Sequence, residues 1–153
     1  MRKKVLMLAV ALLLVAAVSG FAIGIGASFG LDVGETVSPG VMLSLDLDQV
    51  PFLLGVGYNF EEPAMIGVTA DYIMVRENLV DMLNLYAGAG GFLTFAEGAA
   101  ENQIDFGLRV PLALYMFPVD FMELFLEFAP AFRFYPTIDL SMQSAIGFRF
   151  WFN

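Results

Sequence analysis

The stretch that decides the fold is Ile138–Asn153, which reads IDLSMQSAIGFRFWFN. Every second residue from Ile138 to Phe152 is apolar, with one serine as the exception, and three of these residues are phenylalanines. The residues between them include the polar side chains of Asp139, Gln143 and Arg149. Because side chains alternate between the two faces of a strand, this pattern predicts one long β-strand with an apolar and a polar face. Such a strand exceeds the about 5–6 residues of an ordinary sandwich strand and suffices for the about 9–11 that cross a bilayer at a tilt.

The same alternation recurs after residue 20, interrupted by short connections with turn-forming residues. It predicts seven further strands, at residues 21–33, 41–48, 52–60, 66–75, 83–95, 103–117 and 122–135. Eight antiparallel strands in lipid must close into a ring, because an open edge would leave backbone groups without partners. The predicted fold is therefore all-β, an eight-stranded antiparallel up-and-down transmembrane β-barrel whose last strand pairs with Phe21–Val33.

The connections and the prolines are the least regular parts of this pattern. Gly34–Gly40 (GETVSPG) is expected to be a loop, and Arg76–Asp81 (RENLVD) a turn. Pro111 and Pro130 lie inside predicted strands, where each removes a backbone donor. Counting across a turn at Val119 places Pro130 opposite residue 108, so one local bulge on adjacent strands is expected to hold both prolines.

The composition points to lipid as the solvent for one face of these strands. Hydrophobic residues make up 59% of the chain and charged residues 15%, against about 45–50% and 25% in soluble domains. After residue 20, however, no apolar run is long enough to span a membrane as a helix. All sixteen acidic residues follow residue 20, whereas only four arginines and no lysine do. This acidic balance argues against nucleic acid as a partner.

The N-terminus has the pattern of a secretory signal peptide. A basic segment, Arg2 to Lys4, precedes the apolar run Val5–Val18, and small residues follow. Cleavage is expected after Gly20 or Ala22, which divides the chain into a signal peptide, residues 1–20, and a barrel, residues 21–153. The alternative, an uncleaved membrane anchor, is disfavoured because the apolar run is short for a span.

The inverse arrangement, a soluble lipocalin-like barrel with the apolar face inside, has the same period and is the structural alternative. The polar face here carries glycine, serine and few charges, which suits the crowded interior of an eight-stranded barrel better than a solvated exterior. Aromatic residues gather near strand ends, as in the interfacial girdles of membrane barrels: Phe21, Phe52, Phe60, Phe95, Phe117, Phe134, Tyr135, Phe150, Trp151 and Phe152.

The signal peptide, the eight alternating strands and the closing SAIGFRFWF resemble the small outer-membrane barrels of the OmpA, OmpX and OmpW type. The resemblance implies residence in the outer membrane of a Gram-negative-type cell envelope. It also implies that the barrel-assembly machinery recognises the last strand, with Gly147, Phe150 and Phe152 as the assembly signal. Asn153 departs from the family pattern, because it follows the usual terminal aromatic residue.

Inward-facing charges are the candidate functional residues. Strand counting places Arg109 opposite Ala129, diagonal to Glu127, and within reach of Asp71 across the side-chain-free Gly88 and Gly90. It places Arg149 opposite Phe125 and diagonal to Glu123 and Glu127, and Arg133 diagonal to Asp139. These residues form either an ion-pair network that plugs the barrel or a gate that rearranges to pass water or ions. In both cases Arg109→Ala is expected to lower the unfolding midpoint.

Several classes of function are excluded or disfavoured. Without histidine or cysteine, the chain lacks Ser-His and Cys-His nucleophiles and ordinary transition-metal sites, so we expect no enzymatic activity, metal or cofactor. The paired Asp46 and Asp48 lie near a strand end and are expected to meet solvent or a counterion. The predicted outer loops are acidic and expected to be solvated; they carry Glu35, Glu61, Glu62, Glu97 and Glu101.

Three functional hypotheses follow. The leading one is a monomeric integral outer-membrane barrel, in contact with lipid, that has a structural or surface-interaction role. The second is a porin-like narrow pore or carrier for small or hydrophobic solutes. The third is a soluble periplasmic lipid-binding barrel.

Overall fold

A computed structural model describes residues 22–34, 37–60, 62–96 and 103–152. Within them, the chain forms nine strands: β1 (Ile23–Val33), β2 (Val37–Leu47), β3 (Val50–Asn59), β4 (Met65–Val80), β5 (Leu83–Ala96), β6 (Gln103–Arg109), β7 (Leu112–Val119), β8 (Met122–Tyr135) and β9 (Asp139–Phe152). No helix long and apolar enough to cross a membrane occurs among these described residues. The signal peptide predicted for residues 1–20 lies outside them.

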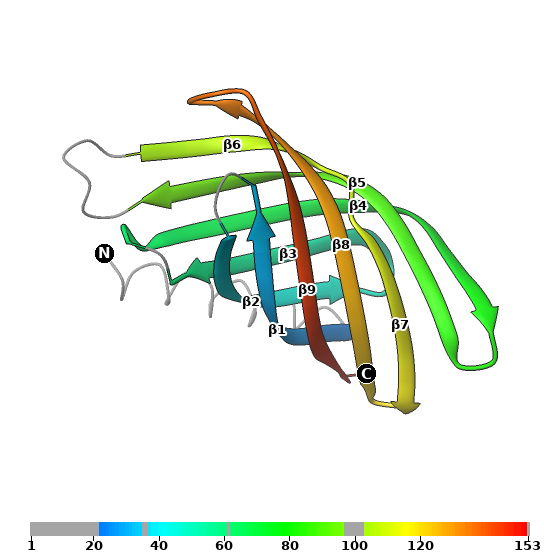
Figure 1. The fold of residues 1–153 in the computed structure, drawn as a ribbon. Helices are drawn as coiled ribbons and strands as arrows, with labels where there is room; N and C mark the ends of the chain where they lie inside the picture. The colour runs from blue at the N-terminus through cyan, green and yellow to red at the C-terminus, as the bar shows by residue number, and fades with distance from the viewer. Residues whose placement is uncertain (1–21, 35–36, 61, 97–102, 153) are drawn as a thin grey trace.

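The strands form one antiparallel sheet that closes into a ring (Figure 1). β1 pairs with β2 on one side and with β9 on the other, and β4 pairs with β5. Both β6 and β7 lie between β5 and β8, so together they take the place of a single strand in the barrel wall. The predicted eight-stranded up-and-down barrel is confirmed, and its last strand pairs with its first. The prediction of one continuous strand at residues 103–117 is wrong, because the strand is interrupted at Val110–Pro111.

The two prolines account for this interruption. The backbone N–H of Gly88 donates to the Pro111 carbonyl at 3.0 Å, and that of Val110 donates to the Pro130 carbonyl at 3.0 Å. A proline has no N–H to donate in return, so two ladder bonds are absent at neighbouring positions. Figure 1 shows the chain bending between β6 and β7 at this place.

The register across the β7–β8 turn also differs from the prediction. Arg109 lies opposite Ala131 rather than Ala129, and residue 108 lies opposite Phe132 rather than Pro130. The turn is Asp120–Phe121, between β7 and β8, so its centre is one residue later than expected. Moving the centre of a hairpin by one residue shifts every pairing by two, which preserves the inward and outward faces.

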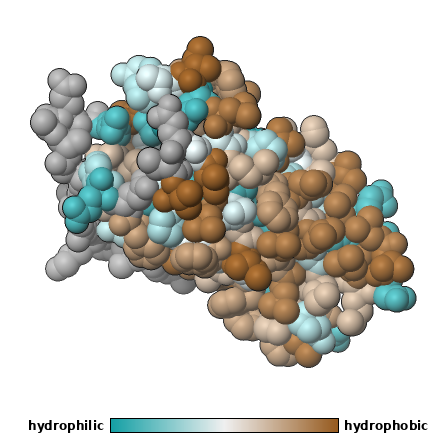
Figure 2. Space-filling model, in the orientation of Figure 1, coloured by the Kyte–Doolittle hydropathy of each residue, from teal (hydrophilic) through white to brown (hydrophobic). Residues whose placement is uncertain are grey.

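The apolar faces of the strands point outward. Leu108, Ile146 and Phe148 are 57%, 63% and 42% exposed, whereas Glu123 and Arg149 are fully buried in the lumen. Hydrophobic residues cover the right-hand part of the surface in Figure 2, where β4, β5, β7 and β8 lie in Figure 1. The inverse arrangement, a soluble barrel with an apolar interior and a polar exterior, is therefore wrong for this chain.

Two predicted connections are instead largely strand. β2 begins at Val37, so much of Gly34–Gly40 is paired with β1. β4 continues through the predicted Arg76–Asp81 turn to Val80, and the chain reverses at Asp81 and Met82, where Asp81 has a φ of 46°. The register of β4 shifts between Ile73 and Val75, which marks a β-bulge with one extra residue.

Candidate functional site: the barrel lumen

The lumen has two different ends. The turn end has the short connections β2–β3, β4–β5 and β7–β8 together with the end of β9, and the loop end has the connections β1–β2, β3–β4, β5–β6 and β8–β9. Charged side chains from five strands point into the lumen and form three groups along it. We call the group nearest the turn end the plug, and the next group towards the loop end the floor.

The plug consists of Asp46, Arg76, Glu123 and Arg149. The Nη1 atom of Arg149 lies 2.5 Å from Oε1 of Glu123 and 3.3 Å from Oδ2 of Asp46. All three side chains are at most 1% exposed. Arg76 closes the group from β4, with Nη2 2.8 Å from Oδ2 of Asp46. Two arginines therefore meet two carboxylates, and the plug is electrically neutral, as burial of charge requires.

Neighbouring aromatic side chains fix the plug in place. The indole Nε1–H of Trp151 donates to Oε2 of Glu123 at 2.9 Å. The Arg149 guanidinium lies 4.8 Å from the centre of the Phe125 ring, within cation–π range. That ring lies across Gly147, where a Cβ would be 2.7 Å from the ring. A glycine at position 147 thus makes the room that Phe125 needs.

The floor consists of Asp71, Arg109 and Glu127. Arg109 forms an ion pair with Glu127 through Nη2, and its Nε lies 3.3 Å from Oδ1 of Asp71. The hydroxyl of Tyr86 donates to the second oxygen of Glu127 at 2.5 Å. All four side chains are buried.

Gly90 allows the floor to form. It pairs with Asp71 on one side and with Arg109 on the other, so it separates the two charged residues across the wall. A Cβ at this position would lie 2.5 Å from the carbonyl oxygen of Ala70 and 2.7 Å from Cα of Asp71. Any side chain would therefore push apart the strands that carry the ion pair.

The third group surrounds Arg133, near the loop end. Its guanidinium lies 3.0 Å from Asp139 and 3.4 Å from Asp105. The Arg133 side chain is 31% exposed, and its partners Asp105 and Asp139 are 16% and 28% exposed, whereas in the plug only Arg76, at 34%, is exposed to that extent. Water therefore screens this group more than the other two.

The structure brings most of the predicted lumen residues together. Arg109 contacts both Asp71 and Glu127, Arg149 contacts Glu123, and Arg133 contacts Asp139. Arg149 lies directly opposite Glu123, and Arg133 lies directly opposite Asp139, whereas the sequence predicts diagonal positions for both pairs. The difference arises because the register between β8 and β9 is shifted relative to the prediction. Among the described residues, no ion pair joins Arg149 to Glu127.

Sequence reasoning missed several members of these groups: Asp46, Arg76, Tyr86, Asp105, Gln143 and Trp151. Asp46 was expected to meet solvent or a counterion, and its actual partners are two arginines. The sequence pattern predicts a turn at Arg76. Alternation along the predicted strand 83–95 directs Tyr86 inward, but nothing in the sequence indicates that its hydroxyl meets Glu127. Trp151 was grouped with the lipid girdle, whereas its indole takes part in the plug.

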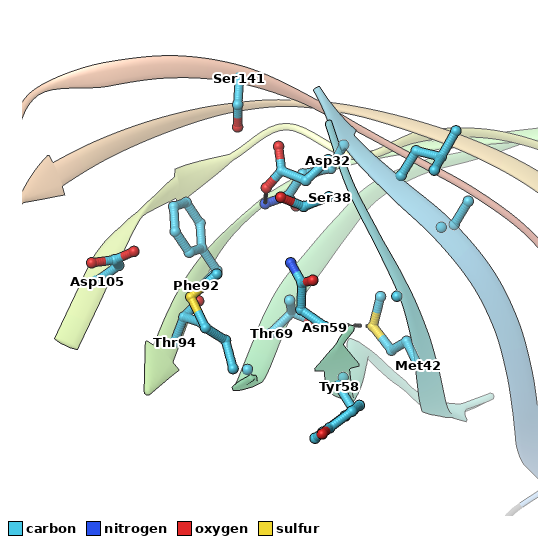
Figure 3. A pocket seen from close by; sticks show the side chains of 18 of the residues that line it. Asp32, Ser38, Met42, Tyr58, Asn59, Thr69, Phe92, Thr94, Asp105 and Ser141 are labelled. Carbon is cyan, nitrogen blue, oxygen red and sulfur yellow. Dashed lines mark hydrogen bonds between the residues drawn. The ribbon is translucent and has the colours of Figure 1, made fainter. Parts of the chain in front are cut away.

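Empty space is distributed unevenly along the lumen. A cavity of about 460 Å³ extends from the floor to the loop end, where Gly34, Glu62 and Pro63 line it. Between the floor and the plug, the void is only about 20 Å³. We call the larger space the loop-end cavity; many of its lining residues are glycines or carry hydroxyl, amide or carboxylate groups (Figure 3).

The remaining predicted residues lie at the edges. Phe150 and Phe152 are 37% and 58% exposed on the outer surface, and Phe150 stacks on Phe121 with ring centres 6.3 Å apart. Four of the acidic loop residues, Glu35, Glu61, Glu97 and Glu101, lie outside the described residues. Within the described part of the chain, no group of three or more potential metal-ligating side chains is arranged to hold a metal.

Comparisons with known proteins match this architecture. No protein-family model and no curated protein matches the chain. A designed transmembrane β-barrel matches with a TM-score of 0.59 at 14% identity, over 86% of this chain and 95% of that one. Neisserial surface protein A matches with a TM-score of 0.54 at 15% identity, over 86% of this chain and 97% of that one. The N-terminal β-barrel domain of Pseudomonas aeruginosa OprF matches with a TM-score of 0.53 at 12% identity, over 83% of this chain and 97% of that one. The fold is thus that of a small transmembrane β-barrel, and the resemblance to small eight-stranded outer-membrane barrels is confirmed at the level of fold.

Proposed function

We propose that the protein is a monomeric, non-enzymatic outer-membrane β-barrel with a closed lumen and a structural or surface-interaction role. The observation that carries this proposal is the neutral plug, in which Arg149, Glu123 and Asp46 fill the lumen with fully buried side chains. The void that separates the plug from the floor is too small to offer a path to a hydrated ion. Outward apolar side chains and the signal-peptide pattern of residues 1–20 support placement in the outer membrane.

Assembly through the last strand belongs to the same proposal. β9 completes the ring by pairing with β1, so it must be in place before the barrel closes. Its outward Phe150 and Phe152 are accessible to the barrel-assembly machinery, in agreement with an assembly signal. Gly147 has a separate steric function, because it accommodates Phe125 inside the barrel.

The conductance of the refolded protein in planar lipid bilayers tests the closed lumen. We expect no channel events from the wild type. The triple variant Arg109→Ala/Glu123→Ala/Arg149→Ala, which removes large side chains from both the plug and the floor, is expected to produce them. Steady channel events from the wild type would overturn the proposal.

The second candidate function is a gated pore, and the loop-end cavity is the observation that favours it. The cavity leads from the loop end to the floor, so movement of Arg109 and of the plug would be sufficient to open a path. In that case the wild type would alternate between silent and conducting states. Bilayer recordings therefore separate the two functions.

A further inference from the structure

The charges in the lumen are not balanced evenly along it. The plug is neutral, whereas the floor has two carboxylates for one arginine. In the loop-end cavity, Asp105 and Asp139 share Arg133, and a third carboxylate, Asp32, has no ion-pair partner among the described residues. The loop-end cavity thus holds the largest excess of negative charge.

Asp32 is the least satisfied of these carboxylates. It lies on β1 between Ser38 on β2 and Gln143 on β9. The amide of Gln143 donates to Oδ2 at 3.4 Å, a long hydrogen bond, and its carbonyl oxygen is already occupied by Arg109 at 2.8 Å. The Oδ1 atom of Asp32 is buried and has no hydrogen-bond partner in the described part of the chain.

A serine lines the cavity beside this carboxylate. Ser38, which pairs with Asp32 between β2 and β1, is 9% exposed, yet no hydrogen bond from its side chain is found in the described structure. Figure 3 shows Ser38 beside Asp32, with Asp105 on a separate part of the wall. Buried polar groups normally have partners, so an unpartnered carboxylate oxygen beside a serine hydroxyl that makes no hydrogen bond indicates a position for a bound group.

The shape and chemistry of the cavity identify the class of ligand. Its volume of about 460 Å³ is within the range of about 300–1,000 Å³ that is usual for small-molecule sites. Calcium takes about six to eight oxygen ligands, whereas no suitable group of three acidic side chains occurs among the described residues. Carboxylate and hydroxyl oxygens accept hydrogen bonds, and a carboxylate accepts them most strongly from a charged N–H group.

We propose that the loop-end cavity binds a small organic cation whose ammonium or guanidinium group donates to the Asp32 carboxylate and to the hydroxyl of Ser38. The site lies on the loop side of the floor, so it does not depend on whether the plug opens. It adds a binding activity to a barrel that is otherwise structural.

Isothermal titration calorimetry of the refolded protein in micelles of an uncharged detergent, at low salt, tests this site. Cadaverine is the probe, and glutarate, a dicarboxylate of similar length, is its oppositely charged counterpart. We expect saturable binding of one cadaverine per barrel and no binding of glutarate. Calcium chloride is titrated in parallel, and displacement of cadaverine by stoichiometric calcium would overturn the assignment to an organic cation.

Two variants locate the binding. Asp32→Asn removes the charge and is expected to weaken cadaverine binding by at least about tenfold. The control, Asp120→Asn, removes the same charge from the β7–β8 turn at the opposite end and is expected to leave binding unchanged. Equal affinities of Asp32→Asn and wild type, or no saturable binding by the wild type, would overturn the proposal.

Ser38→Ala provides a second variant that leaves the net charge unchanged. It is expected to weaken cadaverine binding by a smaller factor than Asp32→Asn. Heat-modifiable migration on gels verifies that each variant is folded before titration. If Ser38→Ala and Asp32→Asn are both folded and both bind as the wild type does, the cation is not held at this wall.

Discussion

The turn-end and loop-end halves of the lumen lie within the same closed wall, yet one is filled and the other is hollow. In the turn-end half, large side chains such as Arg149, Phe125 and Tyr86 point inward. In the loop-end half, the same wall presents Gly30, Ser38 and other small residues. An eight-stranded barrel is just wide enough for side chains to fill it, so the size of the inward residues decides whether a given level is closed.

The two halves also differ in charge, and the difference follows from access to water. In the plug, Arg149, Glu123 and Asp46 are fully buried and Arg76 is 34% exposed. Buried charges need partners, and the plug has equal numbers of arginines and carboxylates. The hollow half tolerates excess carboxylate because space remains for solvent or a ligand. Substitutions on either side of the floor are therefore expected to have different costs.

The largest effect is expected from Arg149→Met, which keeps an unbranched chain and removes the charge. It leaves Glu123 and Asp46 buried with only Arg76 nearby, so we expect the free energy of unfolding to fall by about 3–5 kcal/mol. Urea unfolding in detergent micelles measures the loss, and Trp151, the single tryptophan of the chain, provides the fluorescence signal. A loss below about 1 kcal/mol, the value of a surface pair, would show that the plug is solvated.

Arg109→Ala is expected to cost about 3 kcal/mol, at the lower end of the range for buried pairs. It leaves Asp71 and Glu127 without a cation, but the floor borders the loop-end cavity, so water has access to part of the group. The same urea titration measures the midpoint, and bilayer recordings measure conductance. An unchanged midpoint together with unchanged conductance would contradict both the plug and the gate.

Gly90→Ala sharpens the comparison at the boundary between the halves. We expect it to destabilise the barrel by about 1–3 kcal/mol, the usual cost of overpacking, because the new Cβ meets the backbone of β4. Gly91→Ala, at the next residue, is the matched control, because its Cβ would lie 3.4 Å from the carbonyl oxygen of Gly107, an ordinary van der Waals distance. Equal unfolding midpoints for the two variants would rule out a steric requirement at position 90.

The smallest effect is expected from Arg133→Met in the hollow half. The Arg133 side chain is 31% exposed, so its pairs with Asp105 and Asp139 are screened and contribute at most about 1 kcal/mol. Unfolding in urea at low and high salt measures this contribution. A loss as large as that of Arg149→Met would remove the distinction between the two halves.

The alternating pattern was sufficient to predict the barrel, its closure and which face meets lipid. Period-two alternation survives a register error, which is why Arg109 was placed facing inward and near Glu127 although its partner strand was shifted by two residues. The sequence did not determine the centre of the β7–β8 turn, because its residues are compatible with a turn centred on Val119 as well as with the turn at Asp120–Phe121. The predicted pairings of Arg149 and Arg133 were wrong because a different connection, β8–β9, is centred one residue earlier than expected.

Arg76 shows what strict alternation cannot predict. Residues Asp71 and Ile73 face inward, so period two alone would direct Arg76 outward into lipid. The bulge between Ile73 and Val75 adds one residue and reverses the phase, which brings Arg76 to Asp46. The sequence of β4 contains no glycine or proline at this position that would have marked the bulge. The charge itself was the available signal, because an arginine in an apolar strand must find a partner.

Thiol accessibility at two serines tests the contrast between the open and the filled half most directly. The chain has no cysteine, so Ser141→Cys, in the loop-end cavity, and Ser44→Cys, beside the small void above the plug, each provide a single thiol. The Ser44 hydroxyl oxygen is buried, so its thiol is expected to react only after local opening of the barrel. With a charged methanethiosulfonate reagent on the refolded variants, we predict that Ser141→Cys reacts at least about tenfold faster than Ser44→Cys. Equal rates at the two positions would contradict a closed lumen.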